Sequence, residues 1–241
     1  MIVVAVQGCR GGTGASSIVA GLAQALVQAG ERVLCIDLDP HNLLRLHFNH
    51  DWHDDRGWAN AVNAGQAWHT HSFALGSLLH FLPYGYGDSE SSAAMQSASQ
   101  GDAWSRRLRE LDGDTYRWVL LDMPVTAFTR RQDDSLTDMV LTVAHADPAC
   151  HALLARREFH ETDYLLVNRF APSSALQNDL YTLWQAQYSD WLLPWTIHRD
   201  EAMFEALAHK QSIIAHRPDS LAAQGVRNLA SWLLARHEEA A

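Results

Sequence analysis

The sequence predicts one α/β domain over residues 1–241, with a mostly parallel twisted sheet and helices on both faces. Three observations predict this class. Short runs of β-branched apolar residues alternate with longer helical stretches from end to end, the βαβ pattern of a parallel sheet. The first run leads directly into a glycine-rich turn and a helix. A chain of 241 residues with 47% apolar and 19% charged side chains suits a globular protein with one core.

The strands and helices follow from this alternation. The apolar runs predict strands at residues 2–6, 32–37, 78–82, 117–121, 139–144, 163–167 and 192–197. Helical spacing predicts helices at 15–29, 103–111, 150–159, 174–188, 199–209 and 219–236. Residues 85–101 are rich in Gly, Ser and Ala, which predicts a surface loop. The last helix ends in Glu238 and Glu239 where a lipid-seeking helix carries cations, so we expect it to pack on the core.

The charge balance and the cysteines limit the partners and the compartment. Lys plus Arg total 18 against 28 Asp plus Glu, and this net charge of −10 disfavours general binding to nucleic acid. Cys9, Cys35 and Cys150 have no spacing typical of a disulfide framework or a zinc site, which predicts a cytoplasmic protein. The N-terminus has no signal-peptide pattern, and no run of about 18 apolar residues occurs, so we expect no transmembrane segment.

A glycine-rich turn between Gln7 and Ser17 joins the first strand to the first helix. Glycines permit positive φ and allow backbone N–H groups to turn inward, and the helix N-terminus adds partial positive charge. The turn therefore suits a phosphate group. Ser16, at the start of the helix, is placed to ligate Mg²⁺. A plain strand-to-helix turn would not need four glycines within seven residues.

A dinucleotide-binding loop is the alternative for the same turn. Asp37 ends the second strand about 20 residues farther on, where an acid that binds a ribose would lie. That pattern requires a third small residue at Ser17 after Gly12 and Gly14, and it leaves the earlier glycines without a role. The spacing favours a triphosphate-binding loop.

The order Arg10-Gly11-Gly12-Thr13-Gly14-Ala15-Ser16-Ser17 resembles the deviant Walker A motif, KGGxGK[ST], of the MinD/ParA family of dimeric ATPases. The resemblance implies a P-loop fold whose turn binds ATP and Mg²⁺. Both family lysines are missing. Arg10 takes the place of the lysine that reaches the partner's nucleotide across the dimer, and it keeps the charge. Ala15 replaces the lysine that neutralises the β- and γ-phosphates within the same chain.

Three later strand ends also match motifs of this family. Residues 35–40 resemble its second strand and switch I, which implies that Asp37 supports the metal region and Asp39 orients the attacking water. The two acids also fit turn chemistry, although their place at a strand end favours the site. Residues 118–124 resemble a Walker B strand, which implies that Asp122 holds Mg²⁺ through water. Asn168 and Arg169 match the pair that reads adenine, with Asn168 facing the base.

Further segments resemble one branch of the family, whose members serve bacterial cellulose biosynthesis. These segments are the loop itself and residues 42–49, 57–59 and 197–203. The family usually has Ile-Pro-x-Asp in the last segment, so Asp200 keeps its place near the nucleotide and His198 replaces the proline. The resemblance implies two partners, the small protein BcsR and the inner-membrane cellulose synthase complex. It also implies a cytoplasmic protein that is held at this membrane through its partners.

The resemblance implies a homodimer that forms through ATP and Mg²⁺ and regulates cellulose secretion. A missing cationic contact costs phosphoryl transfer about 2 to 4 kcal/mol, so hydrolysis should be slow unless Arg10 of a second copy compensates. Two alternatives remain: a scaffold that holds a nucleotide without hydrolysing it, and a partitioning ATPase that binds DNA. The second requires a basic surface, for which Arg106, Arg107, Arg109 and Arg130-Arg131 are candidates, although such residues are typical of solvated helix faces.

Overall fold

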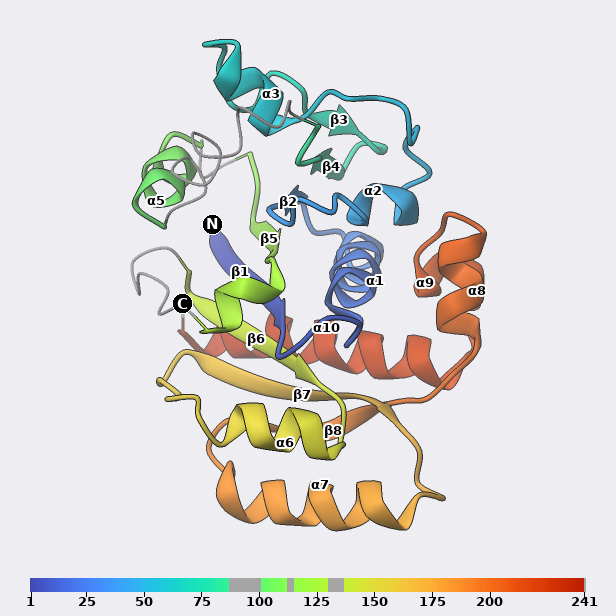
Figure 1. The fold of residues 1–241 in the computed structure, drawn as a ribbon. Coiled ribbons are helices and arrows are strands. Elements are labelled where there is room, and N and C mark those ends of the chain that lie inside the picture. The colour runs from blue at the N-terminus through green and yellow to red at the C-terminus, as the bar shows by residue number, and fades with distance from the viewer. Residues whose placement is uncertain (87–100, 112–114, 130–136, 241) are drawn as a thin grey trace.

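The computed structural model describes residues 1–86, 101–111, 115–129 and 137–240 (Figure 1). Within these ranges eight strands form one sheet in the order β3-β4-β2-β5-β1-β6-β7-β8, and only the β3–β4 pair is antiparallel. The strands are β1 Ile2–Gly8, β2 Val33–Asp37, β3 Phe73–Ala74, β4 Leu79–Leu82, β5 Trp118–Asp122, β6 Met139–Ala144, β7 Asp163–Phe170 and β8 Leu192–His198. All seven predicted strands are present, and β3 is the addition.

The helices of the described residues are α1 Ala15–Gln28, α2 Leu44–His47, α3 Trp58–Asn63, α5 Gly101–Arg109, α6 Pro148–Leu154, α7 Ala175–Gln187, α8 Ala202–Ala208, α9 Ile213–His216, α10 Leu221–Ala240 and the 3₁₀ turn η2 Val125–Thr129. All six predicted helices are found, some with shifted ends, and α2, α3 and α9 were not predicted. The prediction of a helix at 150–159 was wrong in its second half. The chain leaves α6 early because Arg157 donates to the Phe128 carbonyl and pairs with Asp163. The predicted loop at 85–101 lies mostly outside the described residues.

Successive side chains of the strands enter cores on opposite faces of the sheet, as strand geometry requires. In β1, Val4 and Val6 pack in the core under α1 and α10, whereas Val3 and Ala5 pack in the core that contains Trp58 of α3. Helices α6 and α7 cover this second face farther along the sheet, beside β7 and β8 (Figure 1). The structure therefore confirms the predicted mostly parallel sheet with helices on both faces.

The last helix, α10, packs on the core as predicted. Val226, Leu229 and Leu233 are buried among the residues of α1 and the sheet. A Cβ on Gly21 of α1 would lie 3.1 Å from Val226, so the two helices cross in close contact. In the part of the chain that the structure describes, no helix combines the length and the apolar character needed to cross a bilayer.

Candidate functional site

The order of the strands brings the predicted site residues to one edge of the sheet. Strand β1 lies between β5 and β6, and all three run parallel. The glycine-rich loop after β1, Asp122 at the end of β5 and the residues that follow β6 therefore meet at the carboxyl edge, where open α/β sheets bind their ligands. The Cys9 N–H donates to the Val143 carbonyl at 3.0 Å, so the start of the loop continues the β1–β6 pairing.

The loop has the conformation that the glycines predict. Gly12 and Gly14 have φ of +79° and +92°, in the left-handed region that favours glycine. The Thr13 hydroxyl donates to the Arg10 carbonyl at 3.2 Å, and the side-chain amide of Asn168 donates to the Thr13 carbonyl at 2.8 Å. A Cβ on Gly14 would lie only 2.7 Å from the Asn168 nitrogen, so this position admits no larger residue without movement. Hydrogen bonds within the chain thus hold the glycine-rich loop in this conformation.

Two buried carboxyls lie beside this loop. Asp37 and Asp122 are neighbours across β2 and β5, and both are almost fully buried. The Ser16 hydroxyl donates to Asp122, while Asp122 Oδ2 has no hydrogen-bond partner in the described structure. Burial, reinforced by the charge of Asp39, raises the pKa of Asp122 to about 7 in spite of the Ser16 bond. Burial and the nearby Asp122 charge also raise the pKa of Asp37. A cation at this edge would relieve both groups.

Asp37 and Asp39 take part in the turn after β2. The carboxylate of Asp37 accepts from the Asp39 N–H at 3.0 Å and from the Leu44 N–H at 3.3 Å. The Asp39 carboxylate accepts from the backbone N–H of His41 at 2.9 Å and contacts its Nδ1 at 2.7 Å. The turn chemistry that the sequence left open is therefore present, and it fixes both acids at the edge of the sheet. The roles of Asp37 toward a metal and of Asp39 toward water stay predictions.

Arg10 is bound within its own chain. Its guanidinium Nη2 lies 2.6 Å from Asp147 Oδ2 and 3.4 Å from His145 Nδ1, while Nη1 donates to the Gly11 carbonyl at 3.1 Å. Sequence reasoning missed Asp147, although the pair Asp147-Pro148 is a typical helix start and Asp147 caps α6 in the structure. At the neighbouring loop position Ala15 supplies no charge. The basic side chain of the loop therefore faces an acid of the same chain.

The predicted adenine pair lies at a break in the sheet. The β7–β8 pairing shifts register between Val167 and Phe170, and Arg169 has a φ of +54°. The side-chain oxygen of Asn168 accepts from the Arg169 N–H at 2.9 Å, so both the oxygen and the nitrogen of this side-chain amide bind protein groups. The Arg169 guanidinium lies over the Phe204 ring, 4.8 Å from its centroid. Asn168 supports the loop in this structure, and its contact with a base stays a prediction.

The remaining predicted binding residues have structural partners. The Asp200 carboxylate accepts from the Ala202 N–H at 3.0 Å and from the Ala222 N–H at 3.3 Å, which caps the starts of α8 and α10. The Ser17 hydroxyl lies 3.2 Å from Nε2 of the buried His47. Both side chains thus stabilise the surroundings of the loop.

The segments at 42–49 and 57–59 support the end of β2. Arg45 is fully buried, and its guanidinium donates to the carbonyls of Trp52 at 3.1 Å and Asp54 at 2.5 Å. The Trp58 indole donates to the Asp37 carbonyl at 2.8 Å. A Cβ on Gly57 would meet the backbone of Gly85 at 2.2 Å, so the two chain segments touch through their glycines. This packing holds the turn that carries Asp37 and Asp39.

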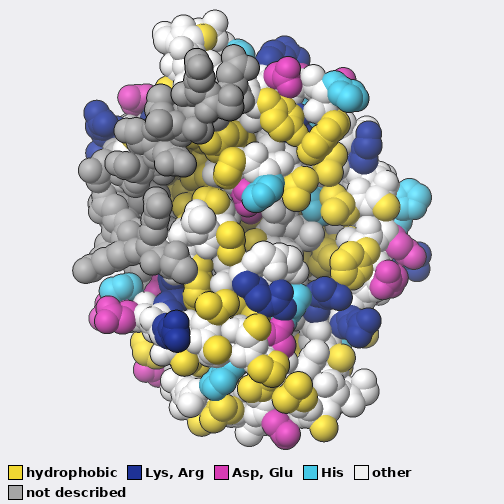
Figure 2. All heavy atoms as spheres, viewed as in Figure 1, with side chains coloured by type: hydrophobic (Ala, Val, Ile, Leu, Met, Phe, Trp, Pro, Cys, Tyr) yellow, Lys and Arg dark blue, Asp and Glu magenta, His cyan; other side chains and the backbone are white. Residues whose placement is uncertain are grey.

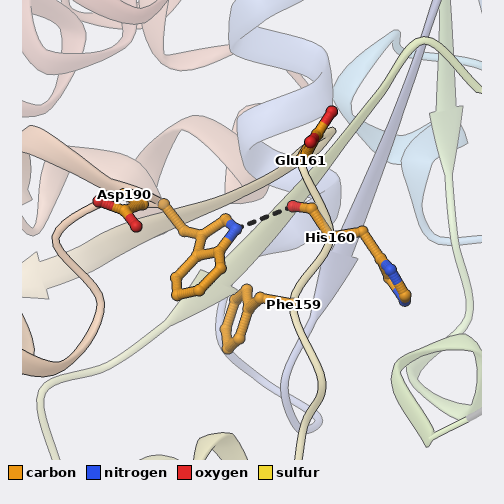
Figure 3. A pocket seen from close by; sticks show the side chains of 5 residues that line it. Phe159, His160, Glu161 and Asp190 are labelled. Carbon is orange, nitrogen blue, oxygen red and sulfur yellow. Dashed lines mark hydrogen bonds between the residues drawn. The ribbon is translucent and has the colours of Figure 1, made fainter.

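A separate hollow of about 480 Å³ lies at the opposite edge of the sheet (Figure 3). Its lining residues are Phe159, His160, Glu161, Asp190 and Trp191. They adjoin the amino-terminal ends of β7 and β8, whereas the glycine-rich loop follows the carboxyl end of β1. The Trp191 indole donates to the His160 carbonyl at 2.8 Å (Figure 3). Two carboxylates in the lining make this hollow unsuited to a phosphate.

Basic side chains form a band across the middle of the face shown in Figure 2, although the chain has a net charge of −10, and α5 lies above and to the left of this band in the same view (Figure 1). Arg106 and Arg109 of α5 are exposed, and the guanidinium of Arg107 stacks at 5.0 Å over the Trp104 ring. Arg107 is therefore partly buried, which corrects the view of it as fully solvated. Arg130 and Arg131 lie outside the described residues.

A mostly parallel sheet with a glycine-rich loop after its central strand is the fold of the P-loop ATPases of the MinD/ParA class. A ParA-family ATPase from Chlorobium tepidum has a TM-score of 0.70 and 17% identity, with 95% of this chain and 98% of that chain covered. The cell division ATPase MinD from Pyrococcus furiosus has a TM-score of 0.73 and 18% identity, with 100% and 99% covered. Cobyrinic acid a,c-diamide synthase from Mycobacterium smegmatis, with bound ADP and magnesium, has a TM-score of 0.73 and 19% identity, with 100% and 96% covered.

The family itself is defined by sequence. The model of the cellulose biosynthesis protein BcsQ family matches residues 1–234. The BcsQ protein of Salmonella typhimurium (strain LT2) is 39% identical over 243 aligned positions, which cover 97% of this chain and 94% of that protein. BcsQ of Escherichia coli (strain K12) is 37% identical over the same shares. The chain belongs to the BcsQ family.

The conformation of the loop predicts that alanine is tolerated at one of its glycines and destabilising at another. Gly14→Ala should lower the free energy of unfolding by about 2 kcal/mol, because a side chain at positive φ is strained and its Cβ meets Asn168. Gly11→Ala should change it by less than about 0.5 kcal/mol, because open space surrounds Gly11. Urea unfolding of both variants measures this. Equal losses would contradict the loop conformation.

The buried carboxyls predict that the nucleotide-free protein loses stability as the pH rises. The pKa of Asp122 is about 7 in the folded protein against an ordinary value of 3.8. The stability gained from the neutral carboxyl is thus complete below about pH 4 and is lost as the pH passes through 7. Asp122→Asn stays neutral, so this variant should lose less stability than the wild type between pH 5 and pH 8 in urea unfolding.

Asp54→Asn is the matched control for this experiment. The hydrogen bonds from Arg56 lower the pKa of Asp54, which therefore stays charged between pH 5 and pH 8. The slope of stability against pH in this range should match that of the wild type. A wild-type slope in Asp122→Asn as well would show that Asp122 is not neutral at low pH in the folded protein.

Proposed function

We propose that the protein is a regulatory ATPase-fold protein of bacterial cellulose biosynthesis, which binds ATP and Mg²⁺ and dimerises through them. Membership of the BcsQ family supports the role in cellulose biosynthesis. One observation supports nucleotide binding. A loop with two left-handed glycines leads into α1, whose first turn contains Ser16, and a buried oxygen of Asp122 without a hydrogen-bond partner lies nearby. This is the arrangement that P-loops use for phosphates and their metal.

The residues present fit ATP and Mg²⁺. The backbone N–H groups of residues 11–17 would hold the phosphates, and Ser16 would ligate the metal, with Asp122 acting through water. The described residues contain no group of three His, Cys, Asp or Glu side chains able to hold a metal ion, so phosphate oxygens and water would complete its shell. Bound Mg²⁺ neutralises charge on the phosphates. The MinD/ParA-class fold supports this use of the site.

Arg10 is the residue that we propose acts across the dimer. With alanine at position 15, the loop has no basic residue other than Arg10 to offset the charge of the phosphates. Arg10 now pairs with Asp147 at 2.6 Å, so reaching a second copy requires it to exchange this carboxylate for a phosphate. A guanidinium can bind a phosphate with two parallel hydrogen bonds, which makes the exchange favourable. Hydrolysis would remain slow, because no cation acts from within the chain at position 15.

We also propose binding partners and a cellular location for the protein. The family resemblance supports the small protein BcsR and the inner-membrane cellulose synthase complex as partners, with the protein cytoplasmic and peripheral to that membrane through them. A partitioning role on DNA is not proposed, since the net charge is −10 and Arg107 stacks on Trp104 within the protein.

The proposal predicts that Arg10→Ala weakens dimerisation with ATP and Mg²⁺ by at least about tenfold, because a charge-assisted contact across the interface is lost. Sedimentation equilibrium with and without ATP measures this. Arg117→Ala is the matched control, since Arg117 pairs with Glu31 at the opposite edge of the sheet and should leave dimerisation unchanged. An Arg10→Ala protein that dimerises as well as the wild type would refute the proposal that Arg10 binds the nucleotide of the second copy.

A scaffold that holds ATP without hydrolysing it is the second candidate, and Ala15 is the observation that favours it. Phosphate release separates the two. The scaffold predicts no release above background in the wild type or in Asp39→Ala. Turnover that Asp39→Ala abolishes would exclude the scaffold, since Asp39 is the residue predicted to orient water.

A further inference from the structure

Two of the three cysteines meet directly beneath the glycine-rich loop. Cys9 follows Gly8 at the start of the loop, and Cys150 lies in the first turn of α6. They are 141 residues apart in sequence, yet the Cys9 thiol donates to the sulfur of Cys150 at 3.1 Å. Both thiols are buried and free. The parallel pairing of β1 with β6 brings the two ends of these strands, and hence the two cysteines, together.

The Cys9 thiol and the Arg10 charge favour the Cys150 thiolate, whereas burial and the Asp147 charge oppose it, and the net effect lowers the pKa of Cys150. Asp147 caps α6 by accepting from the Cys150 N–H at 2.8 Å, which fixes Cys150 in the first turn. The positive charge of the Arg10 guanidinium also lowers the pKa of Cys150. The bond from the Cys9 thiol lowers the pKa of Cys150 and raises that of Cys9. A cysteine whose pKa is lowered therefore lies in direct contact with a second thiol.

Cys35 shows the contrasting case. It lies in the middle of β2, fully buried in the core, and burial raises its pKa. With its pKa raised, Cys35 has little of the thiolate form that acts as the nucleophile. The chain thus contains an internal control for the reactivity of the Cys9–Cys150 pair.

We propose that Cys9 and Cys150 are a redox-sensitive pair that closes to a disulfide when a small peroxide reaches it. The Cys150 thiolate attacks one oxygen of hydrogen peroxide, the O–O bond breaks, and a sulfenic acid and hydroxide result. The Cys9 sulfur then attacks the sulfenic sulfur and expels hydroxide, which takes up the thiol proton as water. Overall, two thiols lose two hydrogen atoms and one peroxide becomes two waters. In the reducing cytoplasm thiols would reopen such a bond, as for other regulatory disulfides.

The disulfide would control the neighbouring arginine, and this step rests on the proposed function. Arg10 directly follows Cys9, and its guanidinium pairs with Asp147, whose carboxylate also caps α6 at the Cys150 N–H. A covalent bond from residue 9 to α6 ties the loop's first turn to the element that carries Asp147. Arg10 then stays with Asp147 and is kept from a second copy. Oxidation should therefore weaken dimerisation with ATP by at least about fivefold, the lower range of ordinary coupling.

The first test treats the full-length native protein with hydrogen peroxide, blocks the remaining thiols and measures intact and peptide masses without reductant. A loss of two hydrogens, a linked Cys9–Cys150 peptide and recovery with dithiothreitol are expected. Cys35→Ala should form the same link, and Cys150→Ser should form none. A wild-type protein that keeps all three free thiols, or that links through Cys35, would overturn the proposal.

The second test compares ATP-dependent dimerisation of the reduced and the linked protein by sedimentation. Weaker dimerisation of the linked form, restored by dithiothreitol, supports the proposal that the disulfide keeps Arg10 from the second copy. Equal dimerisation of both forms overturns this control. If the reduced protein also fails to dimerise, the proposed function fails and the control of dimerisation falls with it, whereas the mass measurement still decides the disulfide.

Discussion

The parallel pairing of β1 with β5 on one side and β6 on the other is the constraint on which the site depends. Three chain segments leave the same edge of the sheet because these strands run in one direction. One carries the glycine-rich loop, one ends in Asp122 and one continues to Asp147. Their side chains are far apart in the sequence, and only this register brings them within hydrogen-bond distance. The buried apolar residues of β1 on both faces of the sheet fix the register.

The loop is held by neutral groups and by one ion pair. Asn168 binds the Thr13 carbonyl, Thr13 binds the Arg10 carbonyl, and Arg10 pairs with Asp147. Beside it, Asp37 and Asp122 are buried and have raised pKa values, because burying an ionised carboxylate without a cation costs free energy. The site therefore combines a positively polarised loop with acids that a metal would stabilise. This combination fits a nucleotide and its metal better than either ligand alone.

The sequence predicted the long elements well because buried parallel strands read as apolar runs and because helices such as α1, α7 and α10 are long enough to show a helical period. It missed β3, α2, α3 and α9, which have two to six residues and are too short to show a period. In the site, the sequence predicted which residues form the motifs, but it did not predict which groups in the protein these residues bind. Asp147 and the Cys9–Cys150 contact depend on pairings across about half of the chain, which no local pattern contains. The bond from Asn168 to the Thr13 carbonyl was hidden for the same reason.

The central claim is that a loop of backbone amides without its own lysine binds a nucleoside triphosphate beside buried acids. Calorimetric titration of the full-length protein with ATP in the presence of Mg²⁺ tests this most directly. The account predicts saturable binding with equal numbers of nucleotides and chains, weakened when Mg²⁺ is withheld. A folded protein that takes up no ATP under these conditions would contradict it.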